Sequence, residues 1–549
     1  MKRSFACFLL AVLLSAPLGA QGFLKGKILY FDAGNNLSEQ RGSSFRFSLL
    51  GGLSVSNSIS ILSVERALEK AAEDDDIAMV FFRPDMISAG MAGREELRQS
   101  LARFAAKGKP VVCYGISFDT SSYYLGSVGD RVFMHPGSSG TLVGPSSTQL
   151  YYKDLLDSLG VRIQLIRHGS YKSAGEPYVR SEMSEENRQQ YQALLGSIWE
   201  PMVEEMASSR GIAADSLRAW VTSLQLSTSR DWLEKGLVDG LKYRDEMEEY
   251  LCHLFGKADP DDLKKVSMSE YIGSLKDNGS KKVAVLYAEG EIVRSGSGIA
   301  GEKFAREIAK VRADSSVKAV VFRVNSPGGE VVAADMIHRE IEALRKDKPV
   351  IASYGDYAAS GGYWISAGTD RIFVDNATLT GSIGVFGQVV SYGEALSKKL
   401  HIHPFTVGTH EHSDMGSGMR PLDEQELTRY QADIDGIYDE FVRVVSDGRG
   451  MDRDAVDAVA QGRVWSGGDA LQIGLADEKG ILLDAVKYAA GRAGLDKYGI
   501  VTYPEKNDLL GEILSLAQET DQPLIHVREI LPSGFSVIAR MPYVELEKK

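Results

Sequence analysis

The feature that most constrains the fold of this chain is an internal repeat with a period of about 240 residues. In the second half, short apolar stretches alternate with amphipathic ones in the order KKVAVLYAEGEIV (281–293), VKAVVFRVNSPGGE, AADMIHREIEALRKDK, PVIASYG and RIFVD. The first half follows the same order from GKILYFDAG (26–34) onward. Strands that alternate with helices in this way are typical of mostly parallel βαβ units. The sequence therefore predicts an α/β protein made of two copies of one unit.

The repeat also predicts the domain boundaries. With 549 residues, the chain exceeds the roughly 250–300 residues at which a single core stops growing. We expect one copy over residues 24–270 and the other over 280–530, with a C-terminal tail over 531–549. Residues 1–20 combine a basic start, an apolar run and small residues, which is the pattern of a secretory signal peptide. An uncleaved N-terminal membrane anchor is the alternative, and both predict an exported protein.

The two copies differ in the loops where a catalytic centre would form. In the second copy, FRVNSPGGE places Gly328 and Gly329 directly after a buried strand. Residues without a Cβ most easily let backbone N–H groups turn toward a bound carbonyl oxygen. Further along, GDYAASGGYWIS (355–366) sets Ser360 before a glycine pair that begins at Gly361. The first copy reads FRPDMISAG and FDTSSYYL at these places, so only the second copy has a candidate nucleophile and oxyanion hole.

Serine and glycine pairs also serve tight turns and close helix packing, so ASGG alone would not identify a nucleophile. The NSPGG motif upstream, on a matching element, favours the catalytic interpretation. A nucleophilic serine needs a base, and none of the nine histidines lies near Ser360 in the sequence.

Four of these histidines lie close together in the segment HIHPFTVGTHEHSD, in which they precede an aspartate: His401, His403, His410, His412 and Asp414. Two H-x-H pairs could place imidazoles on one face of paired strands and bind a metal ion. Their spacing fits no compact metal-site signature, however, and the polar segment THEHSDMGSG resembles a surface loop. We therefore predict no metal site.

A lysine in the first copy is the better candidate for the base. Lys172 lies in IQLIRHGSYKSAGEPYV, in a small-residue loop after an apolar strand. When the two copies are aligned, its position matches that of Glu411 in the second copy. Taken alone it would be an ordinary surface lysine. As a general base it must be neutral, which requires its pKa to fall from about 10.4 to near 7, at a cost of roughly 4 kcal/mol. The two copies are complementary, because one has the serine without the lysine and the other the lysine without the serine.

Four motifs give the chain a resemblance to a known family: RHGSYKSAGEPYVR (167–180), RVNSPGG (323–329), GDYAASGGYWIS (355–366) and TLTGSIGVFG (378–387). Together and in this order, they resemble the long, duplicated form of the signal peptide peptidase A family. These are bacterial serine proteases with a Ser/Lys dyad. The resemblance extends over residues 25–500 and implies two tandem spiral domains of ββα units, as in Clp protease and the crotonases.

The resemblance also implies roles for individual residues. Ser360 is expected to be the nucleophile and Lys172 the general base, while the backbone N–H groups of Gly329 and Gly361 form the oxyanion hole. Ser382, in TGSIG, is expected to hydrogen-bond the lysine amine and orient it. A serine at this place could also be a helix N-cap or a turn residue.

The expected substrates are signal peptides left in the membrane after preprotein processing, together with similar short, unfolded peptides. The resemblance implies a homotetramer on the periplasmic side of the bacterial inner membrane, either anchored or peripheral. It implies no cofactor, and the sequence has no Walker A loop that would indicate an ATPase partner. A net charge of −13, with no long basic run, argues against nucleic-acid binding.

Two other classes of protein remain as alternatives. A crotonase-type acyl-CoA enzyme would use the same fold and oxyanion hole but would need no Ser/Lys pair and would rarely be exported. A non-catalytic oligomeric scaffold would have the fold without a working dyad. The sequence leaves open whether Lys172 meets Ser360 within one chain or across a subunit boundary.

Overall fold

The computed structural model describes residues 24–31, 36–40, 42–48, 52–276, 279–505 and 536–541. These residues form two compact units. The N-terminal unit contains residues 24–145 and 199–276, and the C-terminal unit contains residues 146–198, 279–505 and 536–541. The segment 146–198, which holds Lys172, therefore belongs to the same unit as Ser360. The expected signal peptide or anchor, residues 1–20, lies outside the described residues.

The N-terminal unit is built on a six-stranded sheet in which every pair of neighbouring strands is parallel. Its strands, in spatial order, are β10 (Lys265–Ser267), β1 (Lys27–Phe31), β5 (Ile77–Phe82), β6 (Val111–Gly115), β7 (Arg131–Met134) and β9 (Gly240–Leu241). The main helices are α2 (Ile61–Glu73), α3 (Met91–Ala106), α4 (Thr120–Gly126) and α10 (Arg244–Phe255). A small sheet of β2 (Asn36–Ser38), β4 (Gly52–Ser60) and β3 (Gly42–Ser48) precedes α2. β5 and β6 are buried along their whole length, as expected for central parallel strands.

The C-terminal unit repeats this plan in an eight-stranded sheet. Six strands follow one another as β20 (Val464–Ser466), β18 (Leu379–Gly381), β16 (Val350–Ala359), β14 (Val317–Ser326), β11 (Lys282–Glu289) and β22 (Gly499–Tyr503). β17 (Arg371–Val374) also pairs with β16, and β21 (Glu478–Lys479) pairs with β17. The main helices are α12 (Gly301–Ala313), α13 (Val331–Arg345), α16 (Glu424–Arg449) and α19 (Leu482–Arg492). Apolar residues of the strands and of α12, α13 and α16 share one large core.

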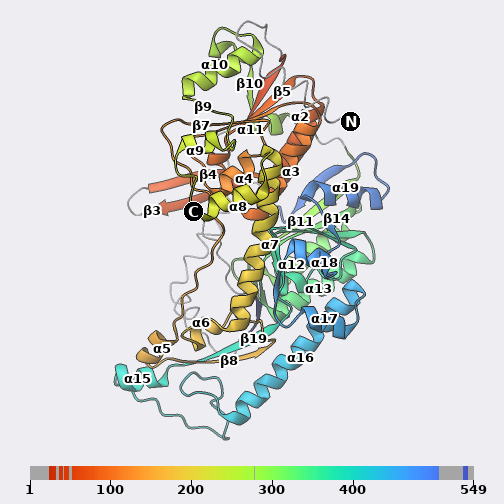
Figure 1. Cartoon of the computed structure of the whole chain (residues 1–549). Helices are drawn as coiled ribbons and strands as arrows, with labels where there is room; N and C mark the ends of the chain where they lie inside the picture. The colour runs from red at the N-terminus through yellow and green to blue at the C-terminus, as the bar shows by residue number, and fades with distance from the viewer. Residues whose placement is uncertain are drawn as a thin grey trace. The chain divides into compact units, whose positions relative to one another are not determined.

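A second sheet of the C-terminal unit joins segments that are far apart in the sequence. Its order is β13 (Ile299–Ala300), β12 (Ile292–Val293), β15 (Gly328–Glu330), β23 (Ser536–Arg540), β19 (Val385–Ser391) and β8 (Arg162–His168). β8 runs antiparallel to β19 over seven paired residues. The different colours of these two neighbouring strands in Figure 1 show their separation along the chain. This pairing attaches the lysine-bearing segment to the serine-bearing unit.

The duplication is visible in individual hydrogen bonds. The hydroxyl of Tyr123 donates to the carbonyl oxygen of Leu237, and the hydroxyl of Tyr363 donates to that of Leu475. In the N-terminal unit, the amine of Lys109 donates to carbonyl oxygens at the end of α2. Lys348 makes the equivalent pair of bonds at the end of α12. The sequence prediction of a duplicated α/β protein is therefore confirmed.

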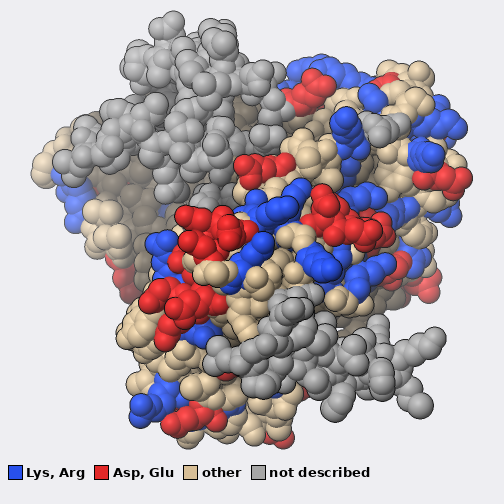
Figure 2. All heavy atoms as spheres, turned by 90° about the horizontal axis from the view of Figure 1, so that it is seen from above, with Lys and Arg blue, Asp and Glu red and all other residues tan. Residues whose placement is uncertain are grey.

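Two surface properties bear on the expected location and partners. Within the described part of the chain, no helix is both long enough and apolar enough to span a bilayer. On the face shown in Figure 2, side chains of Lys and Arg are interspersed with those of Asp and Glu. Although the net charge of the chain is −13, acidic and basic side chains are mixed on this face.

Candidate active site

Ser360 lies at a sharp turn between β16, which ends at Ala359, and the short helix α14 (Gly361–Trp364). Its backbone has φ 55° and ψ −118°, a conformation that costs a non-glycine residue free energy. The backbone N–H of Ser360 donates to the carbonyl oxygen of Gly381 at 2.8 Å, which holds the turn in place. A serine on a strained strand-to-helix turn is the arrangement of a nucleophile elbow.

Lys172 reaches this serine from the loop after β8. Its amine nitrogen Nζ lies 2.7 Å from Ser360 Oγ, 3.1 Å from Ser382 Oγ and 3.0 Å from the carbonyl oxygen of Ser382. The side chains of all three residues are fully buried. The structure thus brings together, within one chain, two residues that are 188 positions apart in the sequence.

The surroundings of the lysine amine favour its neutral form. The three oxygens that accept hydrogen bonds from Lys172 Nζ are uncharged. Burial holds the pKa of Lys172 well below its ordinary value of 10.5, because transfer of an ammonium group out of water is unfavourable. A neutral amine at hydrogen-bond distance from a serine hydroxyl can accept its proton.

Two glycines make room for the lysine. Gly462 has φ +77°, and a Cβ at this position would lie 2.6 Å from Lys172 Cβ. A Cβ at Gly384 would lie 3.2 Å from Lys172 Cδ. The N–H of Tyr171 also donates to the carbonyl oxygen of Gln461 at 2.9 Å. Gly462 could not be identified from the sequence, since QGR at 461–463 carries no signal beyond that of a turn.

An ion pair between a partly exposed arginine and a buried carboxylate supports the lysine loop. Arg167 donates to the carbonyl oxygen of Lys172 at 2.9 Å and to Glu176 Oε1 at 3.1 Å. Glu176 is 1% exposed and also accepts from the hydroxyl of Ser184 at 2.7 Å. These two residues were not predicted from the sequence, although both lie inside the motif RHGSYKSAGEPYVR and a buried acid is unusual. We infer that this ion pair fixes the path of the loop.

The glycines of the NSPGG motif lie directly beside the serine turn. Gly328 has φ +102°, and a Cβ there would lie 2.7 Å from the backbone nitrogen of Gly361. A Cβ at Gly329 would lie 1.9 Å from the carbonyl oxygen of Ile292, so only glycine fits without a shift of the backbone. A Cβ at Gly361 would lie 3.1 Å from the nitrogen of Gly329. The two backbone N–H groups expected to form the oxyanion hole are therefore close neighbours.

Ser382 lies between β18 and β19, so it is not a helix N-cap. Its φ is 48°, and its N–H donates to the carbonyl oxygen of Arg463 at 2.7 Å. Its hydroxyl donates to the carbonyl oxygen of Gly462 at 3.3 Å. That bond leaves a lone pair of the hydroxyl oxygen available to the amine of Lys172.

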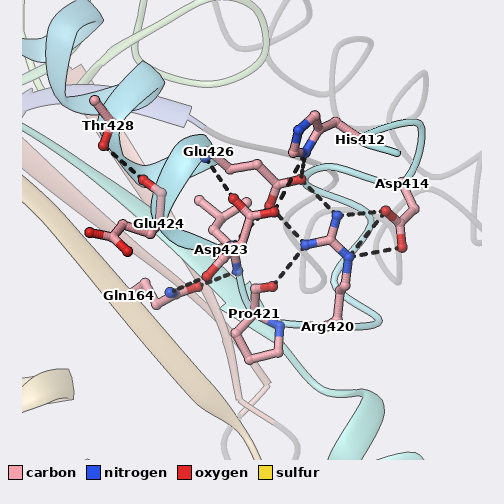
Figure 3. Close-up of polar contacts among 10 residues, drawn as sticks. Gln164, His412, Asp414, Arg420, Pro421, Asp423, Glu424, Glu426 and Thr428 are labelled. Atoms are coloured by element: carbon pink, nitrogen blue, oxygen red, sulfur yellow. Dashed lines mark hydrogen bonds and ion pairs between the residues drawn. The ribbon is translucent and has the colours of Figure 1, made fainter. Parts of the chain in front are cut away.

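The histidine-rich segment forms a different arrangement, away from the serine and lysine contacts. His412 Nδ1 lies 3.0 Å from Glu426 Oε1 and 3.5 Å from Asp423 Oδ2. Arg420 binds both oxygens of Glu426 and both oxygens of Asp414, as Figure 3 shows. These bonds lower the pKa of Glu426 to about 2.

This cluster has a structural explanation. Asp423 is the N-cap of α16, and its side chain and that of Glu426 form a capping box. A cation bound to His412, Asp423 and Glu426 would have to compete with the guanidinium that already holds the buried carboxylate. Among the described residues, the three other histidines of the segment do not join this group. The H-x-H pairs therefore do not converge on one site.

The chain matches a known protein family and several named proteases. The family model "Peptidase family S49" matches the chain twice, over residues 103–254 and 342–496. "Protease 4" of Haemophilus influenzae is 35% identical over 474 residues, which cover 82% of this chain and 77% of that protein. "Serine protease SPPA, chloroplastic" of Arabidopsis thaliana is 30% identical over 94% of this chain and 78% of that protein.

Two further matches cover less of the chain. "Putative signal peptide peptidase SppA" of Enterococcus faecium is 36% identical over 38% of this chain and 60% of that protein. Among solved structures, a point mutant of ClpP1 from Listeria monocytogenes matches 37% of this chain and 94% of its own, with 17% identity and a TM-score of 0.26.

The double match of the family model agrees with the internal repeat, and the second matched segment contains Ser360. The relatives named as proteases are similar over most of their length as well as over most of this chain. The chain therefore belongs to peptidase family S49 and is a serine protease.

Proposed function

We propose that this protein is an endopeptidase with a Ser360–Lys172 dyad. The observation that carries the proposal is the 2.7 Å distance between Lys172 Nζ and Ser360 Oγ in fully buried surroundings. In this proposal, Ser382 orients the amine, and the N–H groups of Gly329 and Gly361 stabilise the oxyanion. The strained turn at Ser360 supports its role as the nucleophile.

The reaction proceeds in two stages. Neutral Lys172 accepts the proton of Ser360 as Oγ attacks the carbonyl carbon of the peptide bond. The two glycine N–H groups stabilise the negative charge that develops on the carbonyl oxygen. Lys172 then donates the proton to the leaving amine, and an acyl-enzyme forms on Ser360. A water molecule, deprotonated by the same lysine, hydrolyses the acyl-enzyme and restores the hydroxyl.

The proposed substrates are signal peptides left in the membrane after preprotein processing, and similar short, unfolded peptides. The Enterococcus faecium relative is named as a putative signal peptide peptidase, which supports this substrate class. A substrate in an extended pose would pair with β15 in place of β23, since β15 carries Gly329 and pairs with β12 on its other edge. We extend the proposal to a homotetramer at the periplasmic surface of the inner membrane.

Labelling with a fluorophosphonate probe tests the dyad. We expect the wild-type protein to be labelled on Ser360, the Ser360→Ala variant to remain unlabelled, and Lys172→Met to be labelled at least about 100-fold more slowly. Lys348→Met is the matched control, because Lys348 is another lysine whose amine binds carbonyl oxygens in the same unit. Unchanged labelling of Lys172→Met would refute the assignment of the base. Wild-type protein without any labelling would favour the acyl-CoA enzyme or the scaffold.

A further inference from the structure

The turn QGR (461–463), just before β20, binds two segments that surround the candidate base. The first carbonyl group of the turn accepts from the N–H of Tyr171 at 2.9 Å. The second accepts from the hydroxyl of Ser382 at 3.3 Å, and the third accepts from the N–H of the same serine at 2.7 Å. Tyr171 precedes Lys172, and Ser382 binds the lysine amine. The turn therefore holds both the loop that carries the lysine and the serine that binds it.

The first residue of this turn has an unusual backbone. Gln461 has a φ of 53°, in the left-handed region that residues with a side chain rarely adopt. The lysine loop packs directly against it, because a Cβ at Gly169 would lie 2.5 Å from the carbonyl oxygen of Gln461. A Cβ at Gly462 would lie 2.7 Å from the backbone nitrogen of Lys172. A change of φ at Gln461 would therefore move the backbone on which the lysine loop rests.

Tyr438, on α16, holds Gln461 in this conformation. The side-chain Nε2 of Gln461 donates to the hydroxyl oxygen of Tyr438 at 3.1 Å, and its backbone N–H donates to the same oxygen at 3.4 Å. The hydroxyl itself donates to Asp457 Oδ1, which also accepts from Gln461 Nε2 at 2.7 Å. Burial, together with the bond to Asp457, raises the pKa of Tyr438, so the hydroxyl keeps its proton and remains a donor. One buried side chain thus binds both the backbone and the side chain of Gln461.

The ring of Tyr438 contacts the other end of the lysine loop. It stacks on the imidazole of His168, with the ring centres 3.8 Å apart and an angle of 13° between the ring planes. His168 is the last residue of β8, and its Nδ1 lies 2.8 Å from Asp435 Oδ1, also on α16. Tyr438 therefore contacts both the strand that leads into the lysine loop and the turn on which this loop rests.

We propose that Tyr438 is a positioning residue for the reaction: its hydroxyl fixes the left-handed backbone of Gln461, and the turn in this form holds the amine of Lys172 at hydrogen-bond distance from Ser360. The inference rests on the proposed function, because it takes Lys172 as the base. Tyr438 acts through Gln461, so it is a positioning residue and not a catalytic one.

Tyr438→Phe tests this role, because it removes the hydroxyl but keeps the ring that stacks on His168. We expect kcat for a peptide substrate to fall about 10-fold, with KM within about twofold of the wild-type value. The rising limb of kcat/KM against pH should move to higher pH. The reason is that an amine held less firmly in its buried place is partly hydrated and keeps its proton to a higher pH. A wild-type kcat and pH profile in Tyr438→Phe would overturn the inference.

Tyr123→Phe is the matched control. It removes a fully buried tyrosine hydroxyl that donates to the carbonyl oxygen of Leu237 in the N-terminal unit. This variant should unfold at a lower temperature but keep the wild-type kcat and pH profile. An equal fall in kcat and an equal shift of the profile in Tyr123→Phe would assign the effect to the loss of any buried hydroxyl and overturn the inference.

Substitutions in the turn separate positioning from a loss of stability. Glycine adopts a left-handed backbone without strain, so Gln461→Gly should keep the turn in its form without the help of Tyr438. The double variant Tyr438→Phe with Gln461→Gly should therefore recover kcat to within about threefold of the wild-type value and restore the pH profile. Tyr438→Phe with Gln461→Ala keeps the strain and should not recover. No recovery with glycine, or equal recovery with alanine, would refute an effect through the backbone of Gln461.

A second variant makes the same test if Tyr438→Phe does not fold. Gln461→Val leaves Tyr438 in place, but a β-branched residue disfavours a left-handed backbone. We expect the same fall in kcat and the same shift of the pH profile in this variant. A wild-type kcat in Gln461→Val would overturn the inference.

Fluorophosphonate labelling separates a failure of this inference from a failure of the proposed function. If the wild type is labelled and Lys172→Met is labelled slowly, a wild-type rate of labelling in folded Tyr438→Phe would overturn the inference alone. Wild-type protein without any labelling would overturn the proposed function, and the inference with it. Thermal unfolding is measured beside each assay. Activity lost only in proportion to the unfolded fraction would mean a purely structural role and would also overturn the inference.

Discussion

The helices α4 and α14 follow matching strands of the two repeats, but their N-terminal ends are built differently. α4 starts from Asp119, which forms a capping box with Ser122 and has an ordinary extended backbone with φ −99°. α14 starts from Ser360, which has φ 55° and makes no side-chain capping bond. The first arrangement satisfies the helix terminus, whereas the second leaves the serine hydroxyl beside Lys172.

The loops that follow the matching strands β5 and β14 differ in a similar way, because polar groups are paired in the first and glycines take their place in the second. After β5, Arg83 and Asp85 form a bidentate ion pair, and Asp85 also accepts from the N–H of Ile116 at 3.0 Å. After β14, Gly328 and Gly329 have no side chains and lie beside Gly361. In the N-terminal unit, side chains of the loop bind one another. In the C-terminal unit, the matching loop has glycines instead, and its backbone N–H groups lie near the serine.

This comparison shows how a duplicated fold can divide its roles. The N-terminal unit keeps polar groups paired at the places where the C-terminal unit has a strained turn and glycines. Among the described residues of the first copy, the one that bonds Ser360 and Ser382 is Lys172, in the segment 146–198, which belongs to the C-terminal compact unit. Substitutions at equivalent positions of the two copies should therefore have very different effects on catalysis.

The largest difference is expected at the helix starts. Ser360→Ala should lower kcat/KM for a peptide substrate by at least about 10⁴-fold, since it removes the attacking oxygen. Thr120→Ala, at the equivalent position, should leave kcat/KM within about twofold. It should lower the free energy of unfolding by about 1 kcal/mol, because Thr120 Oγ1 donates to the carbonyl oxygen of Val143 and accepts from its N–H. A comparable loss of activity in both variants would contradict the division of roles.

The next largest effect is expected at the base. Lys172→Met should lower kcat/KM by about 10³-fold, whereas Lys109→Met in the N-terminal unit should only lower stability. In the wild type, kcat/KM should rise with pH as the amine loses its proton, and level off below pH 10.5, because burial lowers the pKa of Lys172. A profile that is flat from about pH 6 to 10 would count against this base.

The same pKa predicts a pH dependence of stability. Between the lowered pKa of folded Lys172 and the ordinary value of 10.5, the unfolded chain binds more protons than the folded protein. The free energy of unfolding should therefore rise with pH in this window, by at most about 1.4 kcal/mol per pH unit. Chemical denaturation of wild type and Lys172→Met over this range should show a slope difference of this sign. An opposite sign would mean that the amine is charged in the folded protein.

A smaller effect is expected for the residue that orients the amine. Ser382→Ala removes one of the three acceptors of Lys172 Nζ but leaves the backbone carbonyl oxygen of the same residue in place. We expect kcat to fall about 10-fold with little change in KM, and the pH profile of kcat/KM to shift. Steady-state kinetics across pH would separate this role from a purely structural one, which would change stability without moving the profile.

The smallest effect on activity is expected in the loop after β5. Asp85→Asn weakens the ion pair with Arg83 and should lower the free energy of unfolding by about 1–2 kcal/mol. Activity at 25 °C should remain within about twofold of the wild-type value. A loss of more than 10-fold in kcat/KM without unfolding would show that this loop contributes to the reaction.

The sequence predicted the alternation of strands and helices because the apolar periodicity and the repeat are both local signals. It also predicted which copy would supply each candidate residue, since the glycine pair and the serine are present in one copy alone. It did not predict that residues 146–198 join the C-terminal unit, because the pairing of β8 with β19 is a contact between distant segments. Such contacts leave no local periodicity.

Two parts of the site were also beyond the sequence. Gly462 accommodates Lys172, but its motif is that of an ordinary turn. Residues 531–549 were expected to form a tail, whereas residues 536–540 form a strand between β15 and β19. The alternating small and apolar residues of SVIAR are compatible with a strand, but nothing in them identifies the partner strands.

A mixing experiment tests most directly the central claim that one chain carries the complete dyad. Ser360→Ala and Lys172→Met would be co-expressed, purified together and assayed on a peptide substrate beside each variant alone. Because Lys172 and Ser360 meet within one compact unit of the same chain, the mixture should show no activity above that of the single variants. Recovery of a substantial fraction of wild-type activity would show that lysine and serine come from different chains, and would contradict this account.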